Sequence, residues 1–140
     1  MKTSLVERTL TELDHVRILT LLRRDADGNG FPSLRRAVEE MLDTSAFVPS
    51  KQVQPDVVTM NSEILLRDVQ TSRLNTLKLC YPPDADPAMG FVSVLSPVGI
   101  SLLGLRVGNI ARWATPGGDE RAAEILAVPF QPESRGDYTT

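Results

Sequence analysis

The sequence of 140 residues is short of the side chains on which many active sites depend. It has one cysteine, Cys80, and one histidine, His15. A single cysteine excludes an internal disulfide framework and a cysteine-based zinc site, and a single histidine excludes a catalytic centre that needs two imidazoles. We therefore interpret Cys80 as an inert thiol and His15 as a structural or interface histidine.

Long apolar runs and stretches of one charge are also missing. Lysine and arginine number 15 and aspartate and glutamate 18, which gives a formal net charge of −3 and no strongly basic segment. We therefore expect no direct binding to nucleic acid, because such binding depends on neutralising phosphates. No apolar run approaches the ~18–20 residues of a membrane span, and no signal-peptide core follows the first residues. The expectation is a cytoplasmic protein without a membrane partner.

Residues 1–46 show the spacing of apolar residues that is typical of amphipathic helices. Thr11 is suited to cap a helix that runs to about Arg24, and Pro32 to begin a second helix that ends near Thr44 or Ser45. The apolar face expected for the first helix holds His15, Ile18, Leu19 and Leu22, widened by Leu13, Val16 and Leu21, with Asp14, Arg17 and Arg24 opposite. The glycine- and aspartate-rich turn at 25–30 predicts a short antiparallel hairpin.

The second part of the chain carries the signals of β-strands. Residues 47–55 hold two prolines and no period, which is typical of a linker. Strands are expected at 57–60, 64–68, 74–81, 91–95, 110–115 and 123–130, and a short helix from Ser96 and Pro97 to Leu103. Residues 131–140 are expected to be a loose tail. The predicted class is α+β: a helical hairpin (1–46), a linker (47–55) and a unit of five or six antiparallel strands with one short helix (56–140).

The turn between the two helices holds the pattern closest to a metal site. Asp25, Asp27 and Asn29 match the opening of a calcium-binding EF-hand loop, but the twelfth position of that loop is Arg36, where a carboxylate is needed. We interpret the segment as a plain turn. The basic pairs at 23–24 and 35–36 that flank it are interpreted either as a solvated helix end or as a tip that meets a charged partner. No nucleophile with a base, no carboxylate pair and no ligand set is found, so we expect no catalytic residue, metal or cofactor.

Five motifs in order give the chain a family resemblance. They are DVVTMNS at 56–62, SPVG at 96–99, LLGLRVG at 102–108, PGG at 116–118 and QPESRGDY at 131–138. The first four resemble the C-terminal domain of Gre-type transcript elongation factors. The same series of motifs, together with the short helical hairpin and the tail at 131–138, is more similar still to the bacterial regulators of nucleoside diphosphate kinase.

The resemblance implies a fold and a partner. The fold implied for residues 56–140 is that of the FK506-binding proteins, a curved antiparallel sheet with one helix. Gre-type factors bind bacterial RNA polymerase, gripping the rim of its secondary channel with this domain. The family's Ser-Pro segment takes part in that grip, and it falls here on Ser96 and Pro97, followed by Val98. The chain departs from the pattern at Leu95, where the family often has an acidic residue.

The two helices expected here are shorter than those of Gre factors, whose acidic tip helps to hold magnesium for transcript cleavage. Roughly 12–14 residues at ~1.5 Å each give a hairpin of ~18–21 Å. We therefore expect Asp25 and Asp27 to fall short of the polymerase active centre, and the protein to compete with Gre factors without stimulating cleavage. The alternatives are a cleavage factor that uses Asp25 and Asp27, a prolyl isomerase suggested by fold analogy alone, and an indirect regulator of nucleoside diphosphate kinase levels. Oligomeric state and any direct contact with that kinase stay open.

Overall fold

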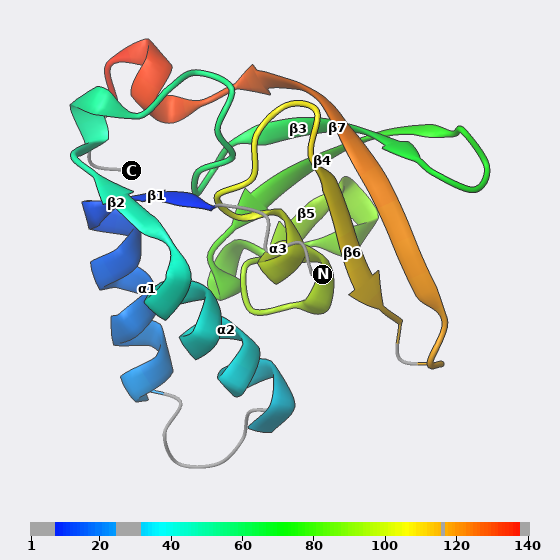
Figure 1. The fold of residues 1–140 in the computed structure, drawn as a ribbon, viewed down its shortest axis with the longest axis horizontal. Helices are drawn as coiled ribbons and strands as arrows, with labels where there is room; N and C mark the ends of the chain where they lie inside the picture. Colours follow the sequence, from blue (N-terminus) through cyan, green and yellow to red (C-terminus); the bar gives the residue numbers. More distant parts are fainter. Residues whose placement is uncertain (1–7, 25–31, 116, 138–140) are drawn as a thin grey trace.

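The computed structural model describes residues 8–24, 32–115 and 117–137. Two helices, α1 (Glu12–Arg24) and α2 (Pro32–Thr44), lie side by side at one end of a curled five-stranded sheet (Figure 1). A third helix, α3 (Pro97–Leu102), is packed inside the curl. The mixed α+β class is as expected from the sequence. In the described part of the chain, no helix is both long enough and apolar enough to cross a membrane.

Both N-terminal helices have the predicted bounds. Thr11 caps α1, because its Oγ1 accepts a hydrogen bond from the backbone N–H of Asp14 at 3.0 Å. The predicted buried face of α1, however, is rotated from the real one. Asp14 is 1% exposed and lies in line with buried Ile18 and Leu22, whereas Val16 is 57% exposed. The prediction failed because it assigned every charged residue to the solvent side, although positions 14, 18 and 22 share one helix face.

A small parallel sheet joins the two helices at their base. Strand β1 (Thr9–Thr11) precedes α1 and strand β2 (Ala46–Val48) follows α2, with Leu10 opposite Phe47. The segment interpreted as a linker thus contains the end of β2, and then a 3₁₀ turn, η1 (Ser50–Gln52). The backbone N–H of Thr9 also donates to the Gly104 carbonyl just beyond α3 at 3.0 Å, so the small sheet is tied to the rest of the molecule.

The main sheet has the strand order β5-β4-β3-β7-β6. Its members are β3 (Glu63–Asp68), β4 (Leu74–Cys80), β5 (Phe91–Ser93), β6 (Ile110–Ala114) and β7 (Glu120–Phe130). Three of the four pairings are antiparallel, but β4 and β5 are parallel. The prediction of an all-antiparallel sheet is therefore wrong at this edge. Two short 3₁₀ turns, η2 (Pro82–Asp84) and η3 (Pro87–Met89), carry the chain back before β5 begins.

Residues 57–60 form no strand, although their apolar run predicts one. Val57, Val58 and Met60 are buried, and Val57 makes a single bridge to Arg106. The segment packs against the chain that leaves α3, with the N–H of Val58 donating to the Leu105 carbonyl at 2.8 Å. An apolar run indicates that a segment is buried, but burial alone does not determine whether the segment pairs with a neighbouring strand.

The described C-terminal residues, 131–137, are not a loose tail. Residues 132–135 form a 3₁₀ turn, η4 (Pro132–Arg135), and Gln131 and Pro132 are buried. The side-chain amide of Gln131 donates to the carbonyls of Gln54 and Val57, both at 2.8 Å. The tail was predicted to be loose because its prolines and polar residues resemble a linker, whereas here they close a connection to residues far back in the chain.

One apolar cluster runs through the molecule. It includes Ile18, Leu22, Val38 and Met41 from the helices together with Ile64, Leu79, Leu103 and Ile125 from the sheet and α3. Burial of this surface is the main source of stability. The helices are thus packed on the same core as the sheet, which matters for the candidate site because α3 lies in the middle of it.

Candidate functional site

The three residues Ser96, Pro97 and Val98, called here the SPV loop, are the N-cap and the first two residues of α3, and they follow the turn that leaves β5. Ser96 is the N-cap of α3, and its Oγ accepts a hydrogen bond from the N–H of Gly99 at 3.1 Å and donates to the Ser93 carbonyl at 2.7 Å. Pro97 occupies the first turn, where no N–H is required. The expected short helix is therefore present, and its start is held in one conformation by its own side chains.

Gly99 fixes how closely the SPV loop approaches the sheet. A Cβ atom at this position would lie 1.9 Å from the Ser93 carbonyl oxygen, which is not possible without moving the backbone. Leu95 and Val98 are partly buried against the core. Pro97 is exposed. The loop thus presents a proline ring to solvent on a backbone held by the Ser96 hydrogen bonds and the close approach at Gly99, which suits contact with a protein surface rather than chemistry.

The other end of α3 is held by Arg8, a residue that sequence analysis missed. Its Nη1 donates to the carbonyls of Ile100 at 2.6 Å and Leu103 at 2.8 Å. These are carbonyls at the C-terminal end of a helix, which otherwise lack partners and favour a cation. Burial lowers the pKa of Arg8 from its ordinary value. No local signal marks Arg8, because its partners lie more than ninety residues away.

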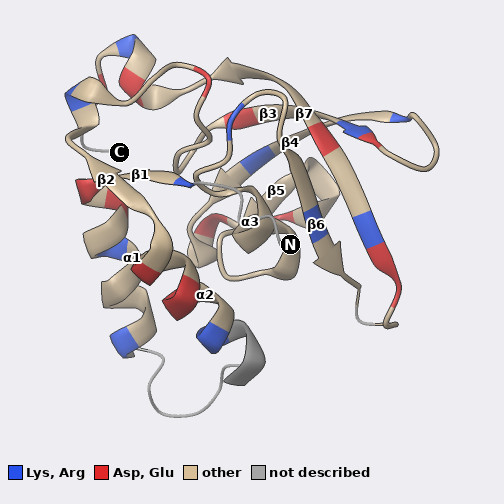
Figure 2. Cartoon of the chain, in the orientation of Figure 1, with Lys and Arg blue, Asp and Glu red and all other residues tan. Residues whose placement is uncertain are grey.

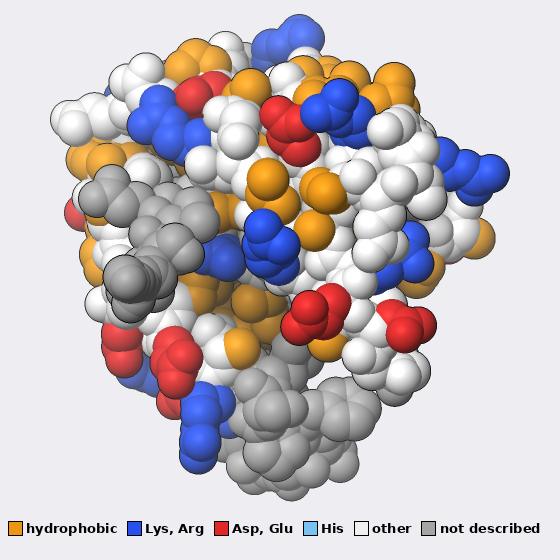
Figure 3. Space-filling model, turned by 45° about the vertical axis from the view of Figure 1, so that its right-hand side comes forward, with side chains coloured by type: hydrophobic (Ala, Val, Ile, Leu, Met, Phe, Trp, Pro, Cys, Tyr) orange, Lys and Arg blue, Asp and Glu red, His pale blue; other side chains and the backbone are white. Residues whose placement is uncertain are grey.

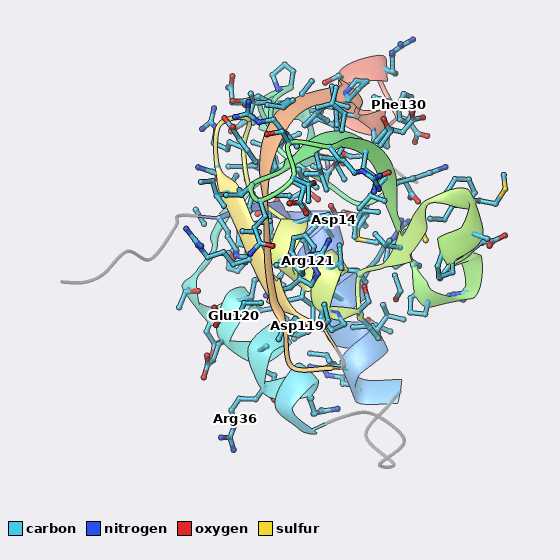
Figure 4. All side chains as sticks on the ribbon, turned by 90° about the vertical axis from the view of Figure 1, so that its right-hand side faces the viewer. Asp14, Arg36, Asp119, Glu120, Arg121 and Phe130 are labelled. Carbon is cyan, nitrogen blue, oxygen red and sulfur yellow. The ribbon has the colours of Figure 1, made fainter. Side chains whose placement is uncertain are left out.

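A buried carboxylate, Asp14, joins α1 to the turn at 59–62. Its Oδ2 accepts the N–H of Met60 at 3.1 Å. In Figure 4 the side chain lies in the interior of the molecule, whereas Arg36 of α2 projects outward. Burial raises the pKa of Asp14 to about 6, against the opposing effect of the hydrogen bond from Met60. The spacing of Asp14 with Ile18 and Leu22 is the signal that could have found it.

A second carboxylate reaches the same turn from the C-terminal end. Thr59 Oγ1 donates to Glu133 Oε1 at 2.7 Å and lies 2.9 Å from Ser62 Oγ. Burial raises the pKa of Glu133, and the hydrogen bond from Thr59 opposes the rise. Asp14 and Glu133, which lie near opposite ends of the sequence, therefore both bind the turn at 59–62. No local sequence pattern predicts that they meet there.

The remaining candidates do not assemble a reactive centre. Asp25 and Asp27 lie outside the described residues. His15 packs on Phe47 with ring centroids 4.2 Å apart, and the Sγ of buried Cys80 lies 3.4 Å from the Val92 carbonyl. Burial raises the pKa of this thiol, which makes it less reactive. Within the described ranges, no group of three or more potential metal ligands is found.

The charges of the surface are mixed. In Figure 2 positively and negatively charged residues both occur along β7 and on both N-terminal helices. The face seen in Figure 3 likewise shows both signs interspersed with apolar side chains. Several of these charges neutralise one another, as in the pair Arg67–Glu124 with 2.6 Å between nitrogen and oxygen. Nothing on the faces in view resembles a phosphate-binding track.

Comparison with known proteins supports the resemblance drawn from the motifs. Residues 52–130 match the family model described as "Transcription elongation factor, GreA/GreB, C-term". The "Regulator of nucleoside diphosphate kinase" of Escherichia coli (strain K12) is 36% identical over 129 residues, which are 92% of this chain and 93% of that protein.

Gre factors themselves are similar over a smaller part. "Transcription elongation factor GreA" of Geobacillus kaustophilus is 32% identical over 91 residues, 65% of this chain and 57% of that protein. A solved structure, "Prokaryotic transcription elongation factor GreA/GreB from Nitrosomonas europaea", has a TM-score of 0.73 and 34% identity, and the match covers 88% of this chain and 99% of that one.

Proposed function

We propose that this chain binds bacterial RNA polymerase. It belongs to the family of the GreA/GreB C-terminal domain and of the regulators of nucleoside diphosphate kinase. It docks through the SPV loop near the secondary channel and competes there with Gre-type factors. It does not stimulate cleavage of the transcript. The observation that carries the proposal is the exposed ring of Pro97 on a capped, closely packed turn inside the family-matching region.

Docking here is mainly apolar. Leu95 stands where Gre-type factors often have an acidic residue, and its side chain packs against the core beside Val98. The Ser96 hydroxyl is occupied within the loop. Pro97 is therefore the principal contact, and it is presented on a unit that has the architecture of the FK506-binding proteins. A polymerase-bound regulator would work in the cytoplasm.

The length of the helices underlies the absence of cleavage. Each helix has 13 residues, so at ~1.5 Å per residue the pair extends ~20 Å as a short antiparallel hairpin. A carboxylate must lie ~2.0–2.1 Å from a magnesium ion to act on it. A hairpin of this length is too short to carry Asp25 and Asp27, which follow α1 in the sequence, into the active centre when the SPV loop rests on the channel rim. The protein then acts by occupying the channel.

Binding is tested with purified core polymerase and a matched pair of variants. Pro97→Asp places a charge on the docking contact, at the first turn of a helix where aspartate is tolerated. Pro87→Asp is the control, because Pro87 is also exposed and also begins a helical turn. We expect Pro97→Asp to weaken binding at least ~tenfold, a cost of ~1.4 kcal/mol, and Pro87→Asp to change it little. Equal affinities for both variants would reject the SPV loop as the contact.

The cleavage alternative is tested on stalled elongation complexes. If the wild-type chain shortens the transcript and a variant with Asp25→Ala and Asp27→Ala does not, the chain is a cleavage factor and the length argument is wrong. The name of the Escherichia coli relative points to nucleoside diphosphate kinase. An altered transcription of that enzyme's gene accounts for such a link without direct contact.

A further inference from the structure

Arg8 connects three parts of the molecule through one residue. Its backbone carbonyl accepts the N–H of Ala46 at 2.9 Å, which ties the start of α1 to the end of α2. Its side chain donates to the carbonyls of Ile100 in α3 and of Leu103, the C-cap of that helix, whose other end is the SPV loop. The base of the two helices and the candidate docking helix are thus joined directly.

The side-chain contact is of a strong kind. A guanidinium stays charged in proteins even when burial lowers its pKa. Hydrogen bonds from a cation to carbonyls at a helix C-terminus are shorter and stronger than neutral ones. Arg8 therefore holds the end of α3 at two atoms, which defines a direction as well as a distance.

Asp14 supplies a second fixed point within the first turn of α1. Its carboxylate holds the N–H of Met60, and the next residue, Asn61, donates its own N–H to the Leu79 carbonyl of β4 at 2.6 Å. This path leads from α1 to the main sheet and is independent of α3. A rod attached at one point can swing, whereas attachment at two points to different elements removes that freedom.

We infer that Arg8 and Asp14 are positioning residues that set the direction of helices α1 and α2 relative to the SPV loop before a partner binds. The functional part of this inference rests on the proposed docking to polymerase. Apolar packing of Ile18 and Leu22 on the core and the hydrogen bond from the Thr9 N–H to the Gly104 carbonyl also hold the base of α1. The packing is less directional than the hydrogen bonds made by Arg8 and Asp14. Hydrogen bonds to specified atoms select one arrangement.

The consequence is geometric. A helix of ~20 Å that tilts by about 15° at its base moves its far end by ~5 Å. If only about one-tenth of the molecules hold the helices in the docking direction, the apparent affinity falls ~tenfold. A chain with both fixed points carries no such penalty.

Double electron–electron resonance measures the direction without any partner. Spin labels replace exposed Arg23 of α1 and exposed Thr76 of β4 in a chain with Cys80→Ala. The parent should give one narrow distance distribution, and Arg8→Met with Asp14→Ala a distribution that is broader or shifted by several ångströms. Asp14→Asn, which keeps an acceptor for Met60, should stay narrow. Arg67→Met is the control, because it also replaces a hydrogen-bonding arginine by methionine, but on a strand away from the helix base, where Arg67 pairs with Glu124.

The outcomes separate this inference from the docking proposal. An unchanged distribution in the double variant overturns it, even if polymerase binding is normal. If the double variant fails to fold, Arg8→Met alone, which keeps the apolar stem, is used with the same criterion. A broadened distribution supports the inference whether or not the parent binds polymerase. If the parent does bind, the double variant should bind ~tenfold more weakly, while Pro97→Asp loses binding with its distribution still narrow.

Discussion

The buried carboxylate of Asp14 makes a pH-dependent contribution to stability that one substitution should remove. The side chain is 1% exposed and accepts one backbone hydrogen bond from Met60. Its ionised form is disfavoured by burial. In Asp14→Asn the side chain keeps its shape and an oxygen that can accept the bond from Met60, but it loses the charge. The variant should therefore be more stable than the wild type at neutral pH.

The size of the effect follows from the pKa. Burial raises the pKa of Asp14 from its ordinary value of 3.8 to about 6, a difference that corresponds to ~3 kcal/mol. Because the folded pKa lies above the unfolded one, the favourable contribution of Asp14 is fully present below about pH 4. It is lost as the pH rises through about 6. Asp14→Asn should match the wild type near pH 4 and exceed it by up to ~3 kcal/mol at pH 7.5.

The assay is urea unfolding of both proteins at several pH values from 4 to 8. The difference between them is the quantity to examine, because Glu133, whose pKa is also raised, and Asp68, whose pKa is lowered by hydrogen bonds from Thr71 and Gln70, titrate in both. Asp14→Ala is the control, since it leaves the Met60 N–H unpaired and should lie ~1–3 kcal/mol below Asp14→Asn at every pH. A difference between Asp14→Asn and wild type that does not change with pH would refute the reasoning.

Four further predictions concern the frame around the site. Gly99→Ala should destabilise the fold by ~1–3 kcal/mol or more in thermal unfolding, because the new Cβ would lie 1.9 Å from the Ser93 carbonyl oxygen; a neutral result would show that α3 can shift. Thr59→Val should cost ~1–2 kcal/mol in urea unfolding, because it leaves Glu133 without its 2.7 Å hydrogen bond; no loss would mean that water replaces the hydroxyl. Arg67→Ala should change stability by less than ~1 kcal/mol, since its partner Glu124 is at the surface, and a larger loss would contradict that assignment. A thiol reagent should modify Cys80 only as fast as the protein opens, and rapid modification under native conditions would contradict its burial.

The elements that the sequence predicts well are those with local causes. The bounds of α1 and α2 follow from helical period, from the Thr11 cap and from Pro32 at a first turn. Helix α3 follows from Ser96 and Pro97 for the same reason. Each of these signals acts within one or two helical turns, so no knowledge of distant partners is needed.

The elements that the sequence does not predict depend on distant partners. Strands β1 and β2 have three residues each and exist because two helix ends meet. The parallel edge strand β5 and the buried connection at 57–60 are likewise set by what lies beside them. Arg8, Asp14 and Glu133 escape notice because each acts on a backbone or hydroxyl group elsewhere in the chain.

The candidate site shows the same division. The cap and the helix start at the SPV loop are readable from Ser96 and Pro97 alone. The proposal that the loop is a docking contact came from a family resemblance. An exposed proline on a tight turn has no reactive group from which a function could be predicted. The close approach that makes the loop rigid depends on Gly99 meeting Ser93, which only the folded chain brings together.

Displacement of a fluorescently labelled Gre factor from bacterial core RNA polymerase, followed by anisotropy as the unlabelled chain is added, tests the central claim most directly. The account predicts full displacement at micromolar concentrations by the wild-type chain, with the transcript in a stalled complex left at its original length. A Gre factor that stays bound at saturating concentrations of the chain, or a transcript that becomes shorter, would contradict it.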